Sequence, residues 1–252
     1  MLLLIDADIP AYSVCANAEE VIEWEQDDIF VRCNKDKVKE ELDSYIEHIV
    51  DQAIVHFDSV ETVLCLSSST NFRKSLQADY KANRKSVRKP VGLRYAKDYM
   101  SARYAAVTWD DLEADDVIGI LATANKDGAL IVSADKDLLQ IPGYHLIDGE
   151  LIHRRKDECE KWFMVQTLSG DRVDNYTGCP GIGPVKAEKL LTPEEGEEPT
   201  LEWMWAKVVE AFEKAGLTDK DALTNARLAY ILQTENYAEN EEVVLWNPPT
   251  IK

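Results

Sequence analysis

The sequence predicts an α/β fold in which a mostly parallel central sheet is flanked by helices and followed by a smaller helical part. Short apolar runs at 2–5, 60–66 and 129–135 have the length of buried strands. Segments with helical spacing of apolar residues lie between them, for example 35–57. Strands that alternate with helices are typical of a parallel sheet.

Each segment is assigned from its own pattern. Residues 2–5 form a strand that ends at Asp6, and Asp8 is a plausible N-cap of a helix through 9–22. The next expected elements are the helix at 35–57, the strand at 60–66, a partly helical basic segment broken at 89–92, and a short strand at 105–109. They are followed by a helix at 113–125, strands at 129–135 and 144–149 with a helix beginning between them, helices from 159 onward including 203–215 and 220–233, and an acidic loop at 194–198.

Composition limits the class of protein. The chain has 252 residues and 45% hydrophobic content, enough for a sizeable core, which we divide into a core at 1–168 and a helical extension at 169–252. Five cysteines without C-x-x-C spacing favour a reducing cytoplasm, and four scattered histidines make a zinc site improbable. The apolar start at 1–5 is too short for a signal peptide, and no run has transmembrane length, so we expect no membrane association.

Charge is distributed unevenly. The net charge of −19 argues against binding nucleic acid. However, residues 71–105 contain ten basic and two acidic residues, which leaves −27 on the remainder of the chain. A basic strip on an acidic body is what a phosphate backbone contacts. If 71–89 is one helix, Arg73, Tyr80, Lys81, Arg84 and Arg88 share one face, where cations and an aromatic ring favour phosphate contact and base stacking over a merely solvated face.

Acidic residues follow several predicted strands. Asp6, Ser67 to Ser69, and Asp135 with Asp137 stand at strand ends, which meet at one edge of a parallel sheet. Any one of these carboxylates, or of those that begin a helix, is explained by helix capping. Together they would repel one another unless cations were bound, and their hard oxygens suit two Mg²⁺ or Mn²⁺ ions that support phosphodiester hydrolysis. The full candidate set is Asp6, Glu113, Asp115, Asp116, Asp135, Asp137, Asp171 and Asp174.

The segment 169–191 joins acids to a glycine-rich turn. Asp171 and Asp174 are three residues apart, the spacing of one helix face. The turn around Gly181 and Gly183 allows the backbone to approach a phosphate, and the helix that follows carries Lys186. A plain turn between helices is the alternative. The whole segment indicates a metal site joined to a DNA-backbone contact.

These motifs, in this order, resemble the 5′-nuclease (flap endonuclease-like) superfamily, and most closely the 5′→3′ exonucleases of short-tailed phages. The resemblance is carried by "LLIDAD", "FRKSLQADYKANR", "LEADDVIG", "SADKDLL" and "GDRVDNYTGCPGIGP" and covers nearly all of the chain. It implies a metal-dependent 5′→3′ nuclease acting on duplex DNA with 5′ ends or flaps, and on the RNA strand of RNA–DNA hybrids. It also implies a PIN-like core, a helical arch at about 71–104 and a helix-hairpin-type DNA clamp at 169–252. A monomer in the cytoplasm is expected. If a phage encodes the chain, this is the cytoplasm of the host cell.

The resemblance also implies roles for single residues. All eight acids match the superfamily's metal ligands. Lys81 and Arg84 match arch cations at the scissile phosphate, whereas Arg73, Tyr80, Lys85, Arg88, Gly181, Gly183 and Lys186 are the expected DNA contacts. Relatives hold a monovalent cation such as K⁺ at the turn that corresponds to 178–184.

One position departs from the superfamily pattern. Where relatives have an aspartate at the end of the second strand, this chain reads "LSSSTNFR", with Ser68 as the equivalent. A hydroxyl is a weaker Mg²⁺ ligand than a carboxylate. Ser68 therefore leaves open a catalytically weakened protein that binds DNA ends. A structure-specific flap endonuclease also stays open, because the arch sequence does not decide between it and an exonuclease. A PIN-type ribonuclease shares the acidic residues but would be shorter and lack "GIGP".

Overall fold

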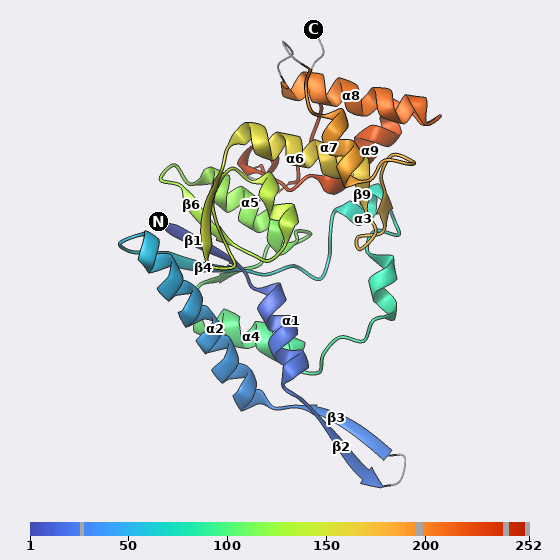
Figure 1. Cartoon of the computed structure of the whole chain (residues 1–252). Coiled ribbons are helices and arrows are strands. Elements are labelled where there is room, and N and C mark those ends of the chain that lie inside the picture. Colours follow the sequence, from blue (N-terminus) through green and yellow to red (C-terminus); the bar gives the residue numbers. More distant parts are fainter. Residues whose placement is uncertain (26–27, 195–198, 239–241, 250–252) are drawn as a thin grey trace. The chain divides into compact units, whose positions relative to one another are not determined.

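The computed structural model describes residues 1–25, 28–194, 199–238 and 242–249 (Figure 1). It confirms the mixed α/β class. The chain divides into two compact units, each of them discontinuous in sequence. Unit 1 contains residues 1–70, 88–136 and 143–153, and unit 2 contains residues 71–87, 137–142 and 154–252. This division does not follow the expected boundary after residue 168, because the basic segment 71–87 packs with the C-terminal helices.

Unit 1 is built on a six-stranded sheet with the order β5-β4-β1-β6-β7-β8. β1 pairs in parallel with β4 and β6, β4 with β5, and β6 with β7, so the predicted mostly parallel sheet is confirmed. A turn with left-handed backbone at Asp148 and Gly149 joins β7 to β8, a strand that we did not predict. The strands are β1 Leu2–Asp6, β4 Glu61–Cys65, β5 Ala106–Val107, β6 Ala129–Val132, β7 Gly143–Ile147 and β8 Glu150–Arg154.

The core of unit 1 lies between this sheet and its helices. Leu3 and Ile5 of β1, two residues apart, project into a cluster with apolar side chains of α1, α2 and α4, whereas α5 packs against β1, β4 and β6. Asn34 caps α2 by accepting from Lys37 N, and Glu113 with Asp116 forms a capping box at the start of α5. The helices are α1 Asp8–Asn17, α2 Lys35–His56, α4 Leu93–Arg103 and α5 Ala114–Ala124.

The predicted helix at 9–22 is wrong in its second half. The helix α1 ends at Asn17, and the chain continues as an antiparallel hairpin of β2 Glu19–Glu25 and β3 Asp28–Cys33. Val21, Ile22 and Trp24 continue the apolar spacing of α1, but β-branched and aromatic side chains favour strands. Trp24 is 75% exposed and Phe30 is 58% exposed.

Unit 2 is helical, with α6 in contact with α7, α8 and α9. Phe163, Trp205, Tyr230 and Trp246 pack edge to face in its interior. The elements are α3 Arg73–Leu76, η1 Ala82–Ser86, η2 Lys136–Gln140, α6 Lys156–Ser169, β9 Gly170–Asp171, β10 Tyr176–Thr177, α7 Pro184–Leu190, α8 Leu201–Lys214, α9 Asp219–Ala229 and η3 Thr234–Asn236. Of the expected acidic loop, residues 195–198 lie outside the described residues.

The basic segment 71–89 is only partly helical, as expected, and the case in which it forms one continuous helix does not hold. It contains a single turn at α3 and a 3₁₀ turn at η1, separated by Lys81 with a left-handed φ of 54°. The expected shared face of its cations therefore does not exist. Across the described ranges, we found no helix with the length and apolar character that a bilayer crossing requires.

Candidate active site

Unit 1 gathers carboxylates at the carboxyl edge of its parallel sheet, as expected. We call Asp6, Asp8, Asp115 and Asp135 the first carboxylate cluster. Asp6 ends β1 and is only 5% exposed. Its Oδ2 accepts a hydrogen bond from Ser133 Oγ at 2.9 Å, and the same hydroxyl accepts from Asp135 N at 3.0 Å. The strand order places β4 and β6 on either side of β1, and this is why these residues meet.

The electrostatics of Asp6 show crowding of like charge. Burial, followed by the charge of Asp8 and then by that of Asp135, raises the pKa of Asp6 to about 6, against the opposing hydrogen bonds from Ser133 and the backbone of Asp8. A buried carboxylate beside other carboxylates costs free energy, and a bound cation would remove that cost.

The Cys65 thiol, at the end of β4, reports the same crowding. Burial raises its pKa, and the charges of Asp6, Asp115 and Asp8 raise it further. The charges of these three carboxylates therefore all reach the Cys65 thiol, although Asp115 belongs to a helix far along the chain.

Asp8 was predicted to cap a helix, but the structure places it in the first carboxylate cluster. Its Oδ2 accepts from Ser67 N at 3.1 Å, and its Oδ1 lies 2.6 Å from Lys97 Nζ. Ser67 Oγ in turn accepts from Ala114 N at 2.9 Å. Ser68, which we expected to face Asp6, has its hydroxyl 3.3 Å from that of Thr70. The residue that links β4 to the cluster is Ser67.

Two of the acids at the start of α5 have structural contacts. Asp116 is fully buried, and its Oδ2 accepts from Glu113 N at 3.3 Å, while the Glu113 side chain accepts from the backbone of the third helical residue. Asp116 therefore caps the start of α5, which is the helix-capping role considered above for each acid in isolation.

Unit 2 holds the other three candidate acids, Asp137, Asp171 and Asp174, which we call the second carboxylate cluster. Asp137 Oδ1 accepts from Gln166 Nε2 at 2.5 Å, and Asp171 Oδ1 accepts from Val173 N at 2.6 Å. Asp171 and Asp174 lie in and after β9, in a turn and not on a helix face. The backbones of the antiparallel pair β9 and β10 lie so close at Gly170 that a Cβ atom there would come within 2.1 Å of the backbone N of Gly178.

Tyr176, which the sequence reasoning missed, lies among these acids. It is 3% exposed. Burial raises its pKa well above the usual value, and the charges of Asp137, Asp171 and Asp174 add to the shift in that order. Only the position of Tyr176 two residues after Asp174 could have pointed to it.

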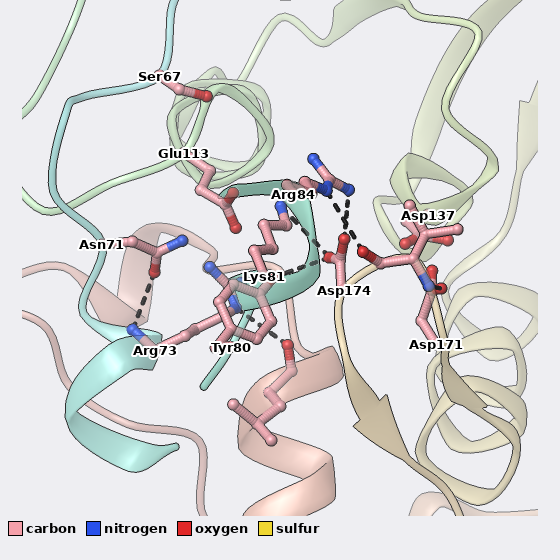
Figure 2. Close-up of polar contacts among 12 residues, drawn as sticks. Ser67, Asn71, Arg73, Tyr80, Lys81, Arg84, Glu113, Asp137, Asp171 and Asp174 are labelled. Atoms are coloured by element: carbon pink, nitrogen blue, oxygen red, sulfur yellow. Dashed lines mark hydrogen bonds and ion pairs between the residues drawn. The ribbon is translucent and has the colours of Figure 1, made fainter. Parts of the chain in front are cut away.

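The cations Lys81 and Arg84 meet Asp174 in unit 2. Arg84 Nη2 lies 2.5 Å from Asp174 Oδ1, and Lys81 Nζ lies 3.3 Å from Oδ2. Tyr80 is buried, and its hydroxyl donates to Oδ2 of the same carboxylate at 2.9 Å. Figure 2 shows the three side chains around Asp174. Tyr80 is therefore not placed to stack on a base, which corrects that expectation.

Arg73 is also not a surface cation. It is 3% exposed, and its guanidinium donates to Leu228 O at 3.0 Å and to Tyr230 O at 2.6 Å at the end of α9. Because buried carbonyls need donors, Arg73 ties α3 to α9, and its guanidinium is buried, whereas the predicted DNA contact requires an exposed one. Arg88 makes a two-point ion pair with Glu19 in unit 1, at 2.8 and 2.6 Å. The side chain of Lys85 lies outside the described part of the structure.

The glycine-rich turn precedes α7. Gly181 has a φ of 75°, and a Cβ on Gly181 or Gly183 would meet no atom within 4 Å, so both backbones are open to an approaching ligand. Lys186 Nζ donates to Gly181 O at 3.2 Å.

The donor chemistry of both clusters fits a hard divalent cation, since every candidate ligand is a carboxylate. Within the described residues, no three Asp, Glu, His or Cys side chains lie close enough together to hold a metal ion by themselves. The fit therefore rests on the oxygen donors and on the buried charge of Asp6.

Comparison with known families places the chain among nucleases. Residues 42–162 match the family model "5'-3' exonuclease, N-terminal resolvase-like domain". The exonuclease of Escherichia phage T7 and the exodeoxyribonuclease of Enterobacteria phage T3 are each 28% identical to the chain, over 98% of the chain and 93% of the relative. The flap endonuclease Xni of Shewanella pealeana is 34% identical over 54% of the chain and 59% of its own length.

Solved structures share the fold. A T5 5′-exonuclease with bound zinc superposes with a TM-score of 0.60 at 15% identity, covering 90% of this chain and 88% of that one. The T5 D15 protein co-crystallized with metal ions gives a TM-score of 0.55 at 16% identity, with 90% and 92% coverage.

Proposed function

We propose that the chain is a metal-dependent 5′→3′ nuclease that hydrolyses phosphodiester bonds in duplex DNA, as its similarity to the phage exonucleases and to the 5′-3′ exonuclease family model supports. The observation that carries the proposal is the first carboxylate cluster, with a buried Asp6 whose pKa is raised by neighbouring carboxylates. Such a cluster is unfavourable in a purely structural role, and it stands at the sheet edge where ligands bind in parallel α/β folds.

We propose Mg²⁺ or Mn²⁺ as the cofactor, two ions per site. The proposed metal ligands of unit 1 are Asp6, Asp8, Glu113, Asp115 and Asp135. The proposed metal ligands of unit 2 are Asp137 and Asp171. Bound divalent ions in such sites activate a water molecule and stabilise charge on the leaving oxygen. We assign Asp116 to the start of α5 and Tyr176 to the support of the acids beside it.

Lys81 and Arg84 are proposed to contact the phosphate that reacts. A fixed cation lowers the barrier when it meets negative charge that grows in the transition state. The exposed Lys186 and the open backbone at Gly181 and Gly183 are proposed to contact the duplex backbone at a distance from the reaction.

The substrate preference is proposed from the relatives. Exonucleases align with nearly the whole chain, whereas proteins named flap endonucleases align with about half of it. We therefore propose exonuclease action as the main activity, flap cleavage as the second candidate, and hydrolysis of the RNA strand of hybrids as an extension. We further propose that the protein acts as a monomer in the cytoplasm.

The test uses a 5′-labelled duplex, a labelled 5′ flap and a labelled RNA–DNA hybrid, each with Mg²⁺ and with a chelator. Release of mononucleotides from the duplex only with Mg²⁺ is the expected result. Dominant release of an intact flap would favour the second candidate. Binding of all three substrates without cleavage would overturn the nuclease proposal.

A further inference from the structure

A loop that carries a predicted metal ligand is bound along its backbone by the basic segment of unit 2. Lys81 N donates to Asp174 O at 2.9 Å. Asn83 Nδ2 reaches Arg172 O at 3.0 Å and Val173 O at 3.2 Å. Residues 77–84 and 171–175 therefore behave as one paired element, with further bonds from Gln77 Nε2 to Asn175 O and from Asn175 Nδ2 to Asp79 O, each at 2.7 Å.

The carboxylate of Asp174 differs from the two others in its cluster in what it binds. Asp137 accepts from the neutral amide of Gln166, and Asp171 accepts from the backbone of its own turn. Asp174 instead faces two cations and a hydroxyl, and its side chain is 13% exposed.

The pairing decides what Asp174 is suited to do. Its one carboxylate faces two cations, Lys81 and Arg84, whereas Asp137 and Asp171 add negative charge elsewhere in the same cluster. A carboxylate whose charge is already matched is a poor ligand for a second cation, since like charges nearby oppose binding. The paired Lys81 and Arg84 suit a phosphate, which is a strong acceptor for Lys and Arg.

We propose that Asp174 is a positioning residue that holds Lys81 and Arg84 for the reacting phosphate, in place of the metal ligand that the superfamily pattern implies. The proposal rests on the proposed nuclease function. Long basic side chains lose rotamer entropy when they are ordered, and a partner that orders them beforehand removes that loss from the reaction step. Arg84 is 50% exposed at its side chain, so it remains accessible to substrate while paired.

The backbone of Lys81 supports the assignment. A left-handed φ of 54° is unfavourable for a residue with a side chain and persists only where neighbouring contacts enforce it. One enforcing contact is the bond from Lys81 N to Asp174 O. Asp174 therefore fixes both the backbone and the side chain of the same cation.

The first experiment measures Mn²⁺ binding to the whole protein by electron paramagnetic resonance. Asp171→Asn, which removes a proposed ligand, is expected to weaken Mn²⁺ binding about tenfold or more. Asp174→Asn removes a negative charge and leaves Lys81 and Arg84 without their partner. It is therefore combined with Lys81→Met in a double variant that has the same net charge as the wild type. That double variant is expected to bind Mn²⁺ like the wild type, which has the same net charge. A tenfold loss in the double variant relative to the wild type would show that Asp174 is a ligand and overturn the proposal.

The second experiment is a double-mutant cycle on single-turnover cleavage rates. If Asp174 acts through Lys81 and Arg84, then Asp174→Asn should cost less once Lys81→Met is present, because only the part that acts through Arg84 remains to be lost. Independent, multiplicative losses would contradict positioning. If Asp174→Asn does not fold, as judged by circular dichroism, then the neutral Asp174→Ser takes its place in both experiments.

Failure of the nuclease proposal is distinguishable from failure of this inference. A wild-type protein that does not cleave DNA with Mg²⁺ or Mn²⁺ would overturn the proposed function. The same cycle, measured on affinity for a fluorescent duplex in chelator, would then decide the inference. Coupling between Asp174 and Lys81 in that affinity supports positioning for a phosphate, and additive losses reject it.

Discussion

Asp174 holds Lys81 at two points, by a backbone hydrogen bond of 2.9 Å from Lys81 N and by an ion pair of 3.3 Å to Lys81 Nζ. The residues are far apart in sequence but lie in the same compact unit. This relationship explains why a basic segment without a continuous helix presents a cation in one place. It also makes Lys81 a better candidate for the reaction step than the other lysines of the segment.

We predict that Lys81→Met lowers the single-turnover cleavage rate by about 100-fold, since a cation fixed at the reacting phosphate stabilises the transition state more than the bound substrate. Lys74→Met is the matched control, because Lys74 is an exposed lysine of the same basic segment. It should change mainly the affinity for DNA and its salt dependence. Similar losses of rate in both variants would remove Lys81 from its special role.

A second prediction concerns Arg73, whose guanidinium donates to two carbonyls at the end of α9. Arg73→Met should lower the free energy of unfolding by about 2 to 4 kcal/mol, because it leaves buried acceptors without donors. The exposed neighbour Lys74, changed to Met, should cost less than about 0.5 kcal/mol. Chemical denaturation of both variants is the measurement. A stable Arg73→Met protein with weakened DNA binding would restore the original interpretation of Arg73 as a DNA contact.

The fold was predictable where local pattern decides structure. Apolar runs marked β1, β4 and β6, and the order of acids and serines after them located the edge at which Asp6, Ser67 and Ser133 meet. Helical spacing also located α2 and α5. These features depend on neighbours within one or two turns, which a single sequence displays directly.

The errors arose where distant contacts override local pattern. Residues 71–89 have the spacing of a helix, but bonds to 172–175 and to the end of α9 hold them in short turns. Asp8 has the sequence position of an N-cap, yet Lys97 and Ser67 N draw its carboxylate toward Asp6. Partners so far away in sequence leave no periodic signal, so neither outcome could be derived from spacing.

A third prediction uses the raised pKa of Asp6. Its value of about 6 exceeds the ordinary 3.8, so the folded state holds the proton more tightly than the unfolded state does. The stability contributed by Asp6 is therefore present below about pH 4 and is lost as the pH rises through 6, by on the order of 2 to 3 kcal/mol. Asp6→Asn should abolish this loss.

The measurement is the free energy of unfolding of both proteins in chelator between pH 4 and 7. The difference between wild type and Asp6→Asn isolates this residue from the other carboxylates. Mn²⁺ added at pH 7 should stabilise the wild type and have less effect on the variant. Parallel pH profiles for the two proteins would mean that Asp6 is not the group whose charge is unfavourable in the fold.

The last prediction concerns the ion pair between Asp8 and Lys97, which lies beside Asp6. Lys97 Nζ is 2.6 Å from Asp8 Oδ1, and both side chains are about 30% exposed. Lys97→Met should lower the stability of the protein in chelator by about 1 to 2 kcal/mol, because Asp8 then faces Asp6 without a cation. It should also increase the rise in melting temperature that Mn²⁺ produces, since the released carboxylate can contribute to binding the ion. Arg94→Met, on the same helix but with a 93% exposed side chain, is the control and should alter neither quantity.

The measurement is a melting curve for each protein with chelator and with a series of Mn²⁺ concentrations. If Lys97→Met gains no more from Mn²⁺ than the wild type does, Asp8 serves only to join β1 to β4, and the charge that Ser68 fails to supply must come from another carboxylate.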